Sequence, residues 1–109
     1  MDLGLKGKVA FITGAAHGQG RAAALALAAE GAHIAAFDIA RPLAYPGYAL
    51  GQEDDLKTLS NACDALGVRC LTFTGDVRDD AAISSAVEAT VAGLGQIDIL
   101  FNNAGIGAY

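Results

Sequence analysis

The sequence predicts an α/β fold in which helices cover a doubly wound parallel sheet. Short apolar runs, typical of buried strands, alternate with segments whose apolar residues recur at helical spacing, in the order β-α-β-α-β-α-β. Glycine or polar residues follow each predicted strand, at the edge where ligands bind in open α/β sheets. Right-handed crossovers between these elements predict the strand order 3-2-1-4.

The composition predicts one small folded domain and argues against several classes of partner. The chain has 109 residues, of which 53% are hydrophobic and 17% charged, so it is not a disordered tail. A net charge of −5 argues against nucleic acid or an anionic membrane as the main partner. No apolar run reaches the roughly 18 residues that span a bilayer, and no cleavable leader opens the chain. We therefore expect a cytoplasmic protein.

The two cysteines fall in different predicted elements, Cys63 in a helix and Cys70 in a strand. We interpret them as reduced, buried small hydrophobes rather than as a disulfide or a metal-binding pair. No metal site is expected.

The first strand and its turn are the most informative stretch. The apolar run Val9–Ile12 meets Thr13 and Gly14, and the turn opens directly into an Ala/Leu-rich helix. Gly14 permits a sharp exit from the strand, Gly18 lets backbone N–H groups approach an anion, and Gly20 lets the helix pack closely. The positive helix N-terminus suits a pyrophosphate. The glycine spacing differs from the common GxGxxG, so a turn without a ligand is the alternative.

The remaining elements follow from periodicity and from glycines that end helices, such as Gly31 and Gly67. They are a helix over 18–30, a strand over 33–37 that ends in Asp38, a helix from Glu53 to Gly67, a strand over 70–74, a helix over 80–94 and a strand over 97–101. Helical spacing predicts two buried stripes: Leu56, Leu59, Cys63 and Leu66 on the second helix, and Ile83, Val87, Val91 and Leu94 on the third.

Three motifs resemble those of the short-chain dehydrogenase/reductase family, in the same order and at similar spacing. Thr13–Gly20 is similar to the family's TGxxxGxG, Asp76-Val77 to its adenine-contacting pair, and Asn102-Asn103-Ala104-Gly105 to its NNAG. The resemblance covers the whole chain. It implies the N-terminal half of a Rossmann-type sheet, in an enzyme that oxidises an alcohol or reduces a carbonyl by hydride transfer to or from NAD.

The resemblance also implies which residues bind the cofactor. Backbone groups from Gly14 to Gly20 would hold the pyrophosphate, while Asp76 would accept from the adenine amino group and Val77 would pack beside the ring. Asn103 and Ala104 would line the ribose. The predicted cofactor-binding residues are Gly14, Ala16, His17, Gly18, Gln19, Gly20, Asp38, Ile39, Asp76, Val77, Asn103, Ala104 and Gly105.

Three polar residues on the first and last strands are expected to be structural. The resemblance implies that Thr13 and Asn102 brace these two strands. For Asn102, satisfying buried backbone groups alone is the alternative. We interpret Asp98, inside the last strand, as structural.

Asp38 favours NAD over NADP. It follows Gly20 by 18 residues, close to the roughly 20 expected for the acid that binds the ribose 2′-hydroxyl. A carboxylate there would repel a 2′-phosphate, and the next residue is Ile39 rather than arginine. A positive charge that could bind a 2′-phosphate is also not expected nearby. His17 is mostly neutral at pH 7, and we interpret Arg41 as a solvated loop residue.

The segment 39–52 shows no helical period and contains both prolines, whereas loops at this place usually take about 2 to 6 residues. We hypothesise a lid over the adenosine half of the cofactor; a surface insertion without function is the alternative. The segment resembles an insertion in the mycofactocin-associated, carveol dehydrogenase-like subgroup. The helix after that insertion starts with an E-D-L pattern in the subgroup, whereas here Glu53–Leu56 departs from this pattern by one residue. That resemblance implies tightly held NAD and an external redox partner. Deleting 44–51 should then speed NAD release.

The family's catalytic serine and YxxxK pair lie beyond the NNAG motif, and this chain contains no YxxxK. We therefore name no catalytic residue and expect the 109-residue chain alone to be inactive. The last strand would have an open apolar edge, which indicates half of a larger protein. The resemblance implies a homodimer or homotetramer that acts on a small alcohol or carbonyl.

Two other functions are alternatives to this one. A non-catalytic NAD-binding module or truncated remnant is the alternative, and a downstream serine and YxxxK would separate it from an enzyme. A phosphate-loop NTPase is disfavoured, because no Gly-Lys-Ser/Thr follows the first turn.

Overall fold

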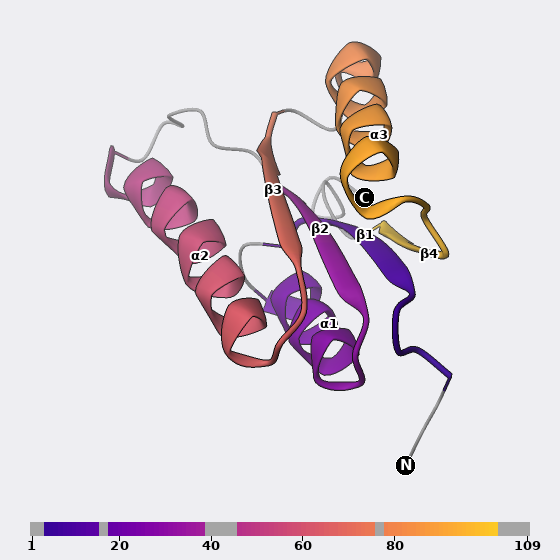
Figure 1. The fold of residues 1–109 in the computed structure, drawn as a ribbon. Coiled ribbons are helices and arrows are strands. Elements are labelled where there is room, and N and C mark those ends of the chain that lie inside the picture. Colours follow the sequence, from indigo (N-terminus) through magenta and orange to yellow (C-terminus); the bar gives the residue numbers. More distant parts are fainter. Residues whose placement is uncertain (1–3, 16–17, 39–45, 76–77, 103–109) are drawn as a thin grey trace.

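The described strands form one parallel sheet in the order β3-β2-β1-β4 (Figure 1). The computed structural model describes residues 4–15, 18–38, 46–75 and 78–102. Strands and helices alternate along the chain, which confirms the predicted fold class and strand order. The strands are β1 (Val9–Thr13), β2 (His33–Asp38), β3 (Cys70–Thr74) and β4 (Ile99–Asn102); the helices are α1 (Gly18–Ala29), α2 (Pro46–Ala65) and α3 (Asp80–Leu94).

The carboxyl ends of the strands lie level with one another. Thr13 at the end of β1 pairs with Phe37 on β2 and with Asn102 on β4. Asp38, the last residue of β2, pairs with Thr74, the last residue of β3. Because the strands are parallel, the chain leaves all of them at the same edge of the sheet, which we call the carboxyl edge.

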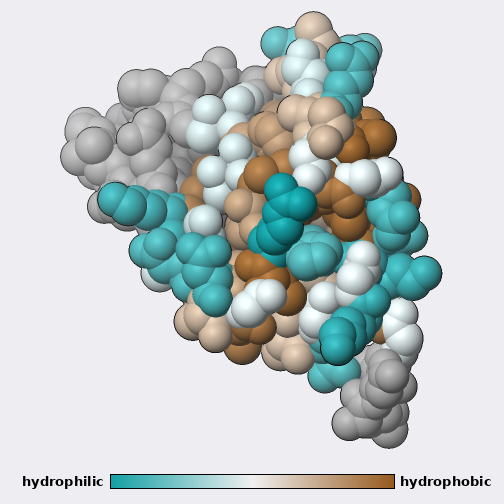
Figure 2. Space-filling view, in the orientation of Figure 1, coloured by the Kyte–Doolittle hydropathy of each residue, from teal (hydrophilic) through white to brown (hydrophobic). Residues whose placement is uncertain are grey.

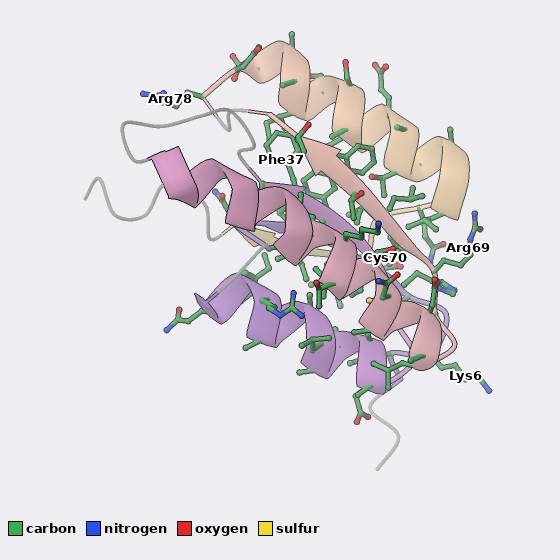
Figure 3. All side chains as sticks on the ribbon, turned by 90° about the vertical axis from the view of Figure 1, so that its left-hand side faces the viewer. Lys6, Phe37, Arg69, Cys70 and Arg78 are labelled. Atoms are coloured by element: carbon green, nitrogen blue, oxygen red, sulfur yellow. The ribbon has the colours of Figure 1, made fainter. Side chains whose placement is uncertain are left out.

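Helices cover both faces of the sheet, with α1 and α2 on one face and α3 on the other (Figure 3). Successive side chains of a strand point to opposite faces, so β1 contributes to both cores. Ala10 and Ile12 pack with α1 and α2, whereas Phe11 packs with α3. The buried core under α1 and α2 consists of Ala10, Ile12, Ala15, Ala24, Ala28, Ile34, Ala36, Leu56, Leu59, Cys63 and Val68; the buried core under α3 consists of Phe11, Ala35, Phe37 and Ala86.

The helix α2 starts earlier than the sequence analysis predicted, which corrects the extent of the long loop. Residues 46–52 are helical, because α2 starts at Pro46 rather than at Glu53. Proline suits the first position of a helix, since its φ is already helical and its missing N–H would have no partner there. Gly47 and Gly51 are poor helix formers that weaken the helical pattern of this segment. Residues 39–45 lie outside the described residues, so the lid stays a prediction.

Two residues predicted to lie on buried helical stripes are exposed. Leu66 is 47% exposed because it follows the last residue of α2, where the chain turns. Val91 is 45% exposed, and the buried residues of α3 are Ala86 and Thr90. The hydroxyl of Thr90 donates to the carbonyl oxygen of Ala86 at 2.7 Å, so this polar residue tolerates burial. The predicted stripe is therefore right for Ile83 and Val87, which pack against the buried core under α3, and wrong for Val91.

The strand β4 starts at Ile99, later than predicted, and Asp98 lies at its entrance. The Oδ2 atom of Asp98 accepts hydrogen bonds from the N–H of Val9 at 2.8 Å and from the side chain of Gln96 at 2.6 Å. These bonds join the amino ends of β1 and β4, which confirms the structural role of Asp98. Within the described part of the chain, β4 pairs only with β1, and Leu100 is 68% exposed.

The other edge strand of the described sheet is β3, and the surface on this side of the molecule is partly apolar (Figure 2). Cys70, Leu71 and Phe73 of this strand are only half-buried.

Among the described residues, the helices lack the combination of length and apolar character that crossing a membrane requires.

Candidate functional site

The turn after β1 has the backbone conformation that a close anion contact requires. Gly14 and Gly18 have φ values of 66° and 65°, a region that residues with a Cβ rarely adopt. A Cβ placed on Gly18 would meet no atom within 4 Å, so the space in front of this backbone is open. Ala15, between them, is fully buried, and its N–H donates to the carbonyl oxygen of Phe37 at 3.3 Å. This bond ties the turn to the end of β2.

The helix α1 begins within this turn, at Gly18. The first N–H groups of a helix have no partner within the helix, and they carry a partial positive charge. The first turn of α1 contains no acidic side chain that would compete with an anion. Gly20 is buried and Gln19 is exposed. The start of α1 can therefore accept a phosphate group.

Asp38 places a carboxylate at the carboxyl edge, beside this turn. It is only 5% exposed, and it is the last residue of β2. The N–H of Gly75 donates to the backbone carbonyl oxygen of Asp38 at 3.0 Å, which fixes the ends of β2 and β3 together. A Cβ on Gly75 would lie 3.0 Å from Cζ of Phe37 and 3.3 Å from Cβ of Ala82, so glycine is needed here for packing.

Thr13 and Asn102 join the ends of β1 and β4 at the same edge. The hydroxyl of Thr13 donates to Oδ1 of Asn102 at 3.0 Å, and the two residues pair in the sheet. This contact confirms the bracing that the family resemblance implied. Asn102 is exposed, and its side chain accepts from a side chain of the neighbouring strand rather than from a buried backbone group.

The structure places five of the predicted cofactor-binding residues, and the first turn and Asp38 lie at one edge. Sequence reasoning gave no role to Gly75, although its N–H group, like that of Ala15, fixes the geometry of this edge. The position of Gly75 directly after β3 was the available signal. Gly14, Gly18, Gln19, Gly20 and Asp38 are described, whereas Ala16, His17, Ile39, Asp76, Val77, Asn103, Ala104 and Gly105 lie outside the described residues.

A metal site is not formed by the described part of the chain, where no three histidine, cysteine or acidic side chains gather. The site described above consists instead of backbone N–H groups, one buried carboxylate and a polar pair on β1 and β4. Such a combination suits a ligand that has both phosphate and hydroxyl groups.

Nearly the whole chain matches one known protein family. A family model described as short chain dehydrogenase matches residues 8–109. The chain belongs to the short-chain dehydrogenase family.

Relatives of this chain agree with it in sequence and structure. It is 46% identical to an uncharacterized oxidoreductase of Mycobacterium tuberculosis over 106 residues, 97% of this chain and 39% of that one. It is 40% identical to (-)-trans-carveol dehydrogenase of Rhodococcus erythropolis over 102 residues, 94% of this chain and 37% of that one. A crystal structure of carveol dehydrogenase from Mycobacterium avium in complex with NAD is 47% identical and superimposes with a TM-score of 0.83, covering 94% of this chain and 37% of that chain.

These matches cover the chain almost completely but only part of each relative. The chain spans 39%, 37% and 37% of the lengths of the three relatives above.

The Thr13–Asn102 contact predicts a measurable coupling between β1 and β4. We expect Thr13→Val to lower the free energy of unfolding by about 1 kcal/mol, because valine keeps the shape but cannot donate to Asn102. Urea denaturation of Thr13→Val, Asn102→Ala and the double variant gives the coupling energy. Losses that simply add in the double variant would contradict a bond between these side chains.

Proposed function

We propose that this chain is the NAD-binding portion of an oxidoreductase that oxidises a small alcohol, or reduces the matching carbonyl, by hydride transfer. The observation that carries the proposal is the juxtaposition of the open glycine turn, the start of α1 and buried Asp38 at one edge of the sheet. The crystal structure of a short chain dehydrogenase from Mycobacterium paratuberculosis bound to NAD supports it. That structure is 43% identical, with a TM-score of 0.83, and the match covers 94% of this chain and 38% of that chain.

The described residues fit a dinucleotide. The pyrophosphate would lie in the open space beside Gly18, against the first N–H groups of α1. The carboxylate of Asp38 would accept hydrogen bonds from a ribose hydroxyl group and would repel a phosphate on that ribose, so we propose NAD rather than NADP. When bound, NAD supplies the hydride acceptor. The residues described here bind and orient it; we assign no proton-transfer step to them.

Four further aspects rest on family membership. We propose that the complete protein is cytoplasmic, that it is a homodimer or homotetramer, and that a tyrosine, a lysine and a serine outside this chain carry out catalysis. Similarity to carveol dehydrogenases supports the subgroup in which NAD stays bound and an external redox partner reoxidises it. Mass spectrometry of the native purified protein tests this last point. Tightly held NAD would appear as bound dinucleotide, and protein free of nucleotide would count against it.

The glycine turn provides a direct test of cofactor binding. We expect Gly18→Ala to raise the dissociation constant for NAD at least 10-fold, or about 1.4 kcal/mol, because the added methyl group would occupy the pyrophosphate position. The substitution also imposes a backbone strain of about 1–2 kcal/mol at a φ of 65°. Isothermal titration with NAD measures the affinity, and urea denaturation measures the strain.

Gly95→Ala is the matched control for this test. Gly95 ends α3 with a φ of 93°, and a Cβ there would also meet no atom within 4 Å. Both substitutions should therefore destabilise the protein to a similar extent, whereas only Gly18→Ala should weaken NAD binding. Equal NAD affinities in the two variants would contradict the assignment of the first turn to the pyrophosphate.

A further inference from the structure

The strand β3 has an open edge, because it is the outermost strand on its side of the described sheet and pairs there only with β2. Figure 1 shows β3 at the front of the molecule, with α2 on one side and α3 on the other, and Figure 2 shows the partly apolar surface in the same view. Thr72 and Thr74 are exposed, and the other three residues of β3 are half-buried. Another strand could therefore reach this edge.

The backbone groups of every second residue of β3 point away from the sheet. The N–H of Ile34 on β2 donates to the carbonyl oxygen of Arg69 at 2.9 Å, and the N–H of Gly75 donates to that of Asp38 at 3.0 Å. Because the direction of these groups alternates along a strand, every second residue counted from Arg69 faces β2. The residues between them direct their N–H and carbonyl groups toward the open edge, and they are Cys70, Thr72 and Thr74.

These outward groups are complementary to those of an identical strand. If a second copy lies antiparallel with its Thr72 opposite Thr72 of the first, Cys70 of each copy faces Thr74 of the other. Each of these facing pairs can exchange two N–H···O bonds. A pairing centred on any other residue of β3 would leave at least one outward-facing residue without a partner. The spacing of these residues therefore specifies one register.

The side chains of β3 also match in this register. Phe73 packs against the buried core under α3, and a Cβ on Gly93 of α3 would lie 3.0 Å from Cδ1 of Leu71, so both residues lie on the face that α3 covers. Leu71 of each copy would face Phe73 of the other, and such aliphatic–aromatic pairs stabilise antiparallel strands. Natural edge strands often avoid pairing by means of a charge or a proline, and Cys70–Thr74 contains neither.

The charges next to β3 along the chain favour the antiparallel arrangement. Exposed Arg69 precedes the strand, whereas exposed Arg78, Asp79 and Asp80 follow it, with one positive and two negative charges. Antiparallel copies bring the positive end of each β3 to the negative end of the other. Arg69 would lie opposite Gly75 of the second copy, which has no side chain to obstruct it.

We propose that the open edge of β3 is a docking surface for a second copy of this chain, which adds its own β3 antiparallel about a two-fold axis at Thr72. The two four-stranded sheets then form one continuous sheet, and each copy covers the exposed edge of the other. This inference does not rest on the proposed function, because the pairing uses none of the residues assigned to NAD.

Sedimentation equilibrium of the 109-residue chain, from micromolar to submillimolar concentration, tests the proposal. We expect a monomer–dimer equilibrium. Thr72→Lys and Thr72→Asp should each raise the dissociation constant of the dimer about 10-fold, because each variant places two like charges opposite one another. An equimolar mixture of these two variants should recover dimerisation, because lysine then faces aspartate. Circular dichroism of each variant checks that a substitution at this exposed position leaves the fold intact.

Leu100→Lys is the matched control. It places the same charge on β4, the other edge strand of the described sheet, where Leu100 is 68% exposed. It should leave the dissociation constant of the dimer unchanged. A chain that stays monomeric over the whole concentration range would overturn the proposal, as would a dimer that Leu100→Lys weakens and Thr72→Lys does not. A mixture of the lysine and aspartate variants that stays monomeric would show that Thr72 does not face its counterpart, and would overturn it too.

Discussion

Replacing Asp38 with serine is expected to reduce the preference for NAD over NADP about 100-fold, or about 2.7 kcal/mol. Two effects act in the same direction. NAD loses the hydrogen bonds to a charged acceptor, which contribute about 1.5–3 kcal/mol, and NADP is no longer repelled by a nearly buried carboxylate. The backbone bond from Gly75 to the carbonyl oxygen of Asp38 does not depend on the side chain and should persist. Dissociation constants for both dinucleotides give the ratio.

Asp98→Asn is the control for charge alone. It removes one negative charge at the amino end of β4, where the carboxylate binds Val9 and Gln96, and the amide oxygen can still accept a hydrogen bond. The ratio of NAD to NADP affinity should stay unchanged, because Asp98 lies at the other end of the sheet. If Asp38→Ser left the ratio at its wild-type value, Asp38 would not be the residue that selects the dinucleotide.

Replacing Phe37 with alanine is expected to lower the free energy of unfolding by about 3–5 kcal/mol. Phe37 is 1% exposed, and its ring lies 6.3 Å from that of Phe11 between the sheet and α3. It also supports Gly75, since a Cβ at that glycine would lie 3.0 Å from its ring. Alanine would leave a cavity under the carboxyl edge that the surrounding strands and α3 cannot fill. Urea denaturation measures the loss.

Phe37→Leu separates the cavity from the loss of the aromatic ring. Leucine fills most of the space, so its cost should be about 1 kcal/mol. Phe37 precedes Asp38, and the carbonyl oxygen of Phe37 accepts a hydrogen bond from the N–H of Ala15. The alanine variant should therefore also bind NAD more weakly, because the cavity would disturb the position of both residues at this edge. Similar stabilities for the alanine and leucine variants would show that this core collapses around the missing ring.

The fold class, strand order and positions of the strands could be predicted because they depend on local patterns. The buried run at Val9–Thr13 and the alternation of strands with helices specify a parallel sheet, whatever the details of packing. Glycines after Thr13 and an acid after Phe37 predicted the location of the site, because the topology brings the ends of parallel strands to one edge.

The tertiary structure decided what depends on contacts between distant residues. Helical spacing could not show that Thr90 rather than Val91 is buried, because the bond from Thr90 to Ala86 removes the penalty for burying its hydroxyl. The segment that contains Pro46 and two glycines shows no helical period in the sequence, yet α2 starts at Pro46. The packing of Cys70 against the core that contains Cys63 depends on the turn that returns the chain from α2 to β3, and the sequence positions of the two cysteines do not show it. Local composition determined where the elements are, and packing determined which of their side chains meet.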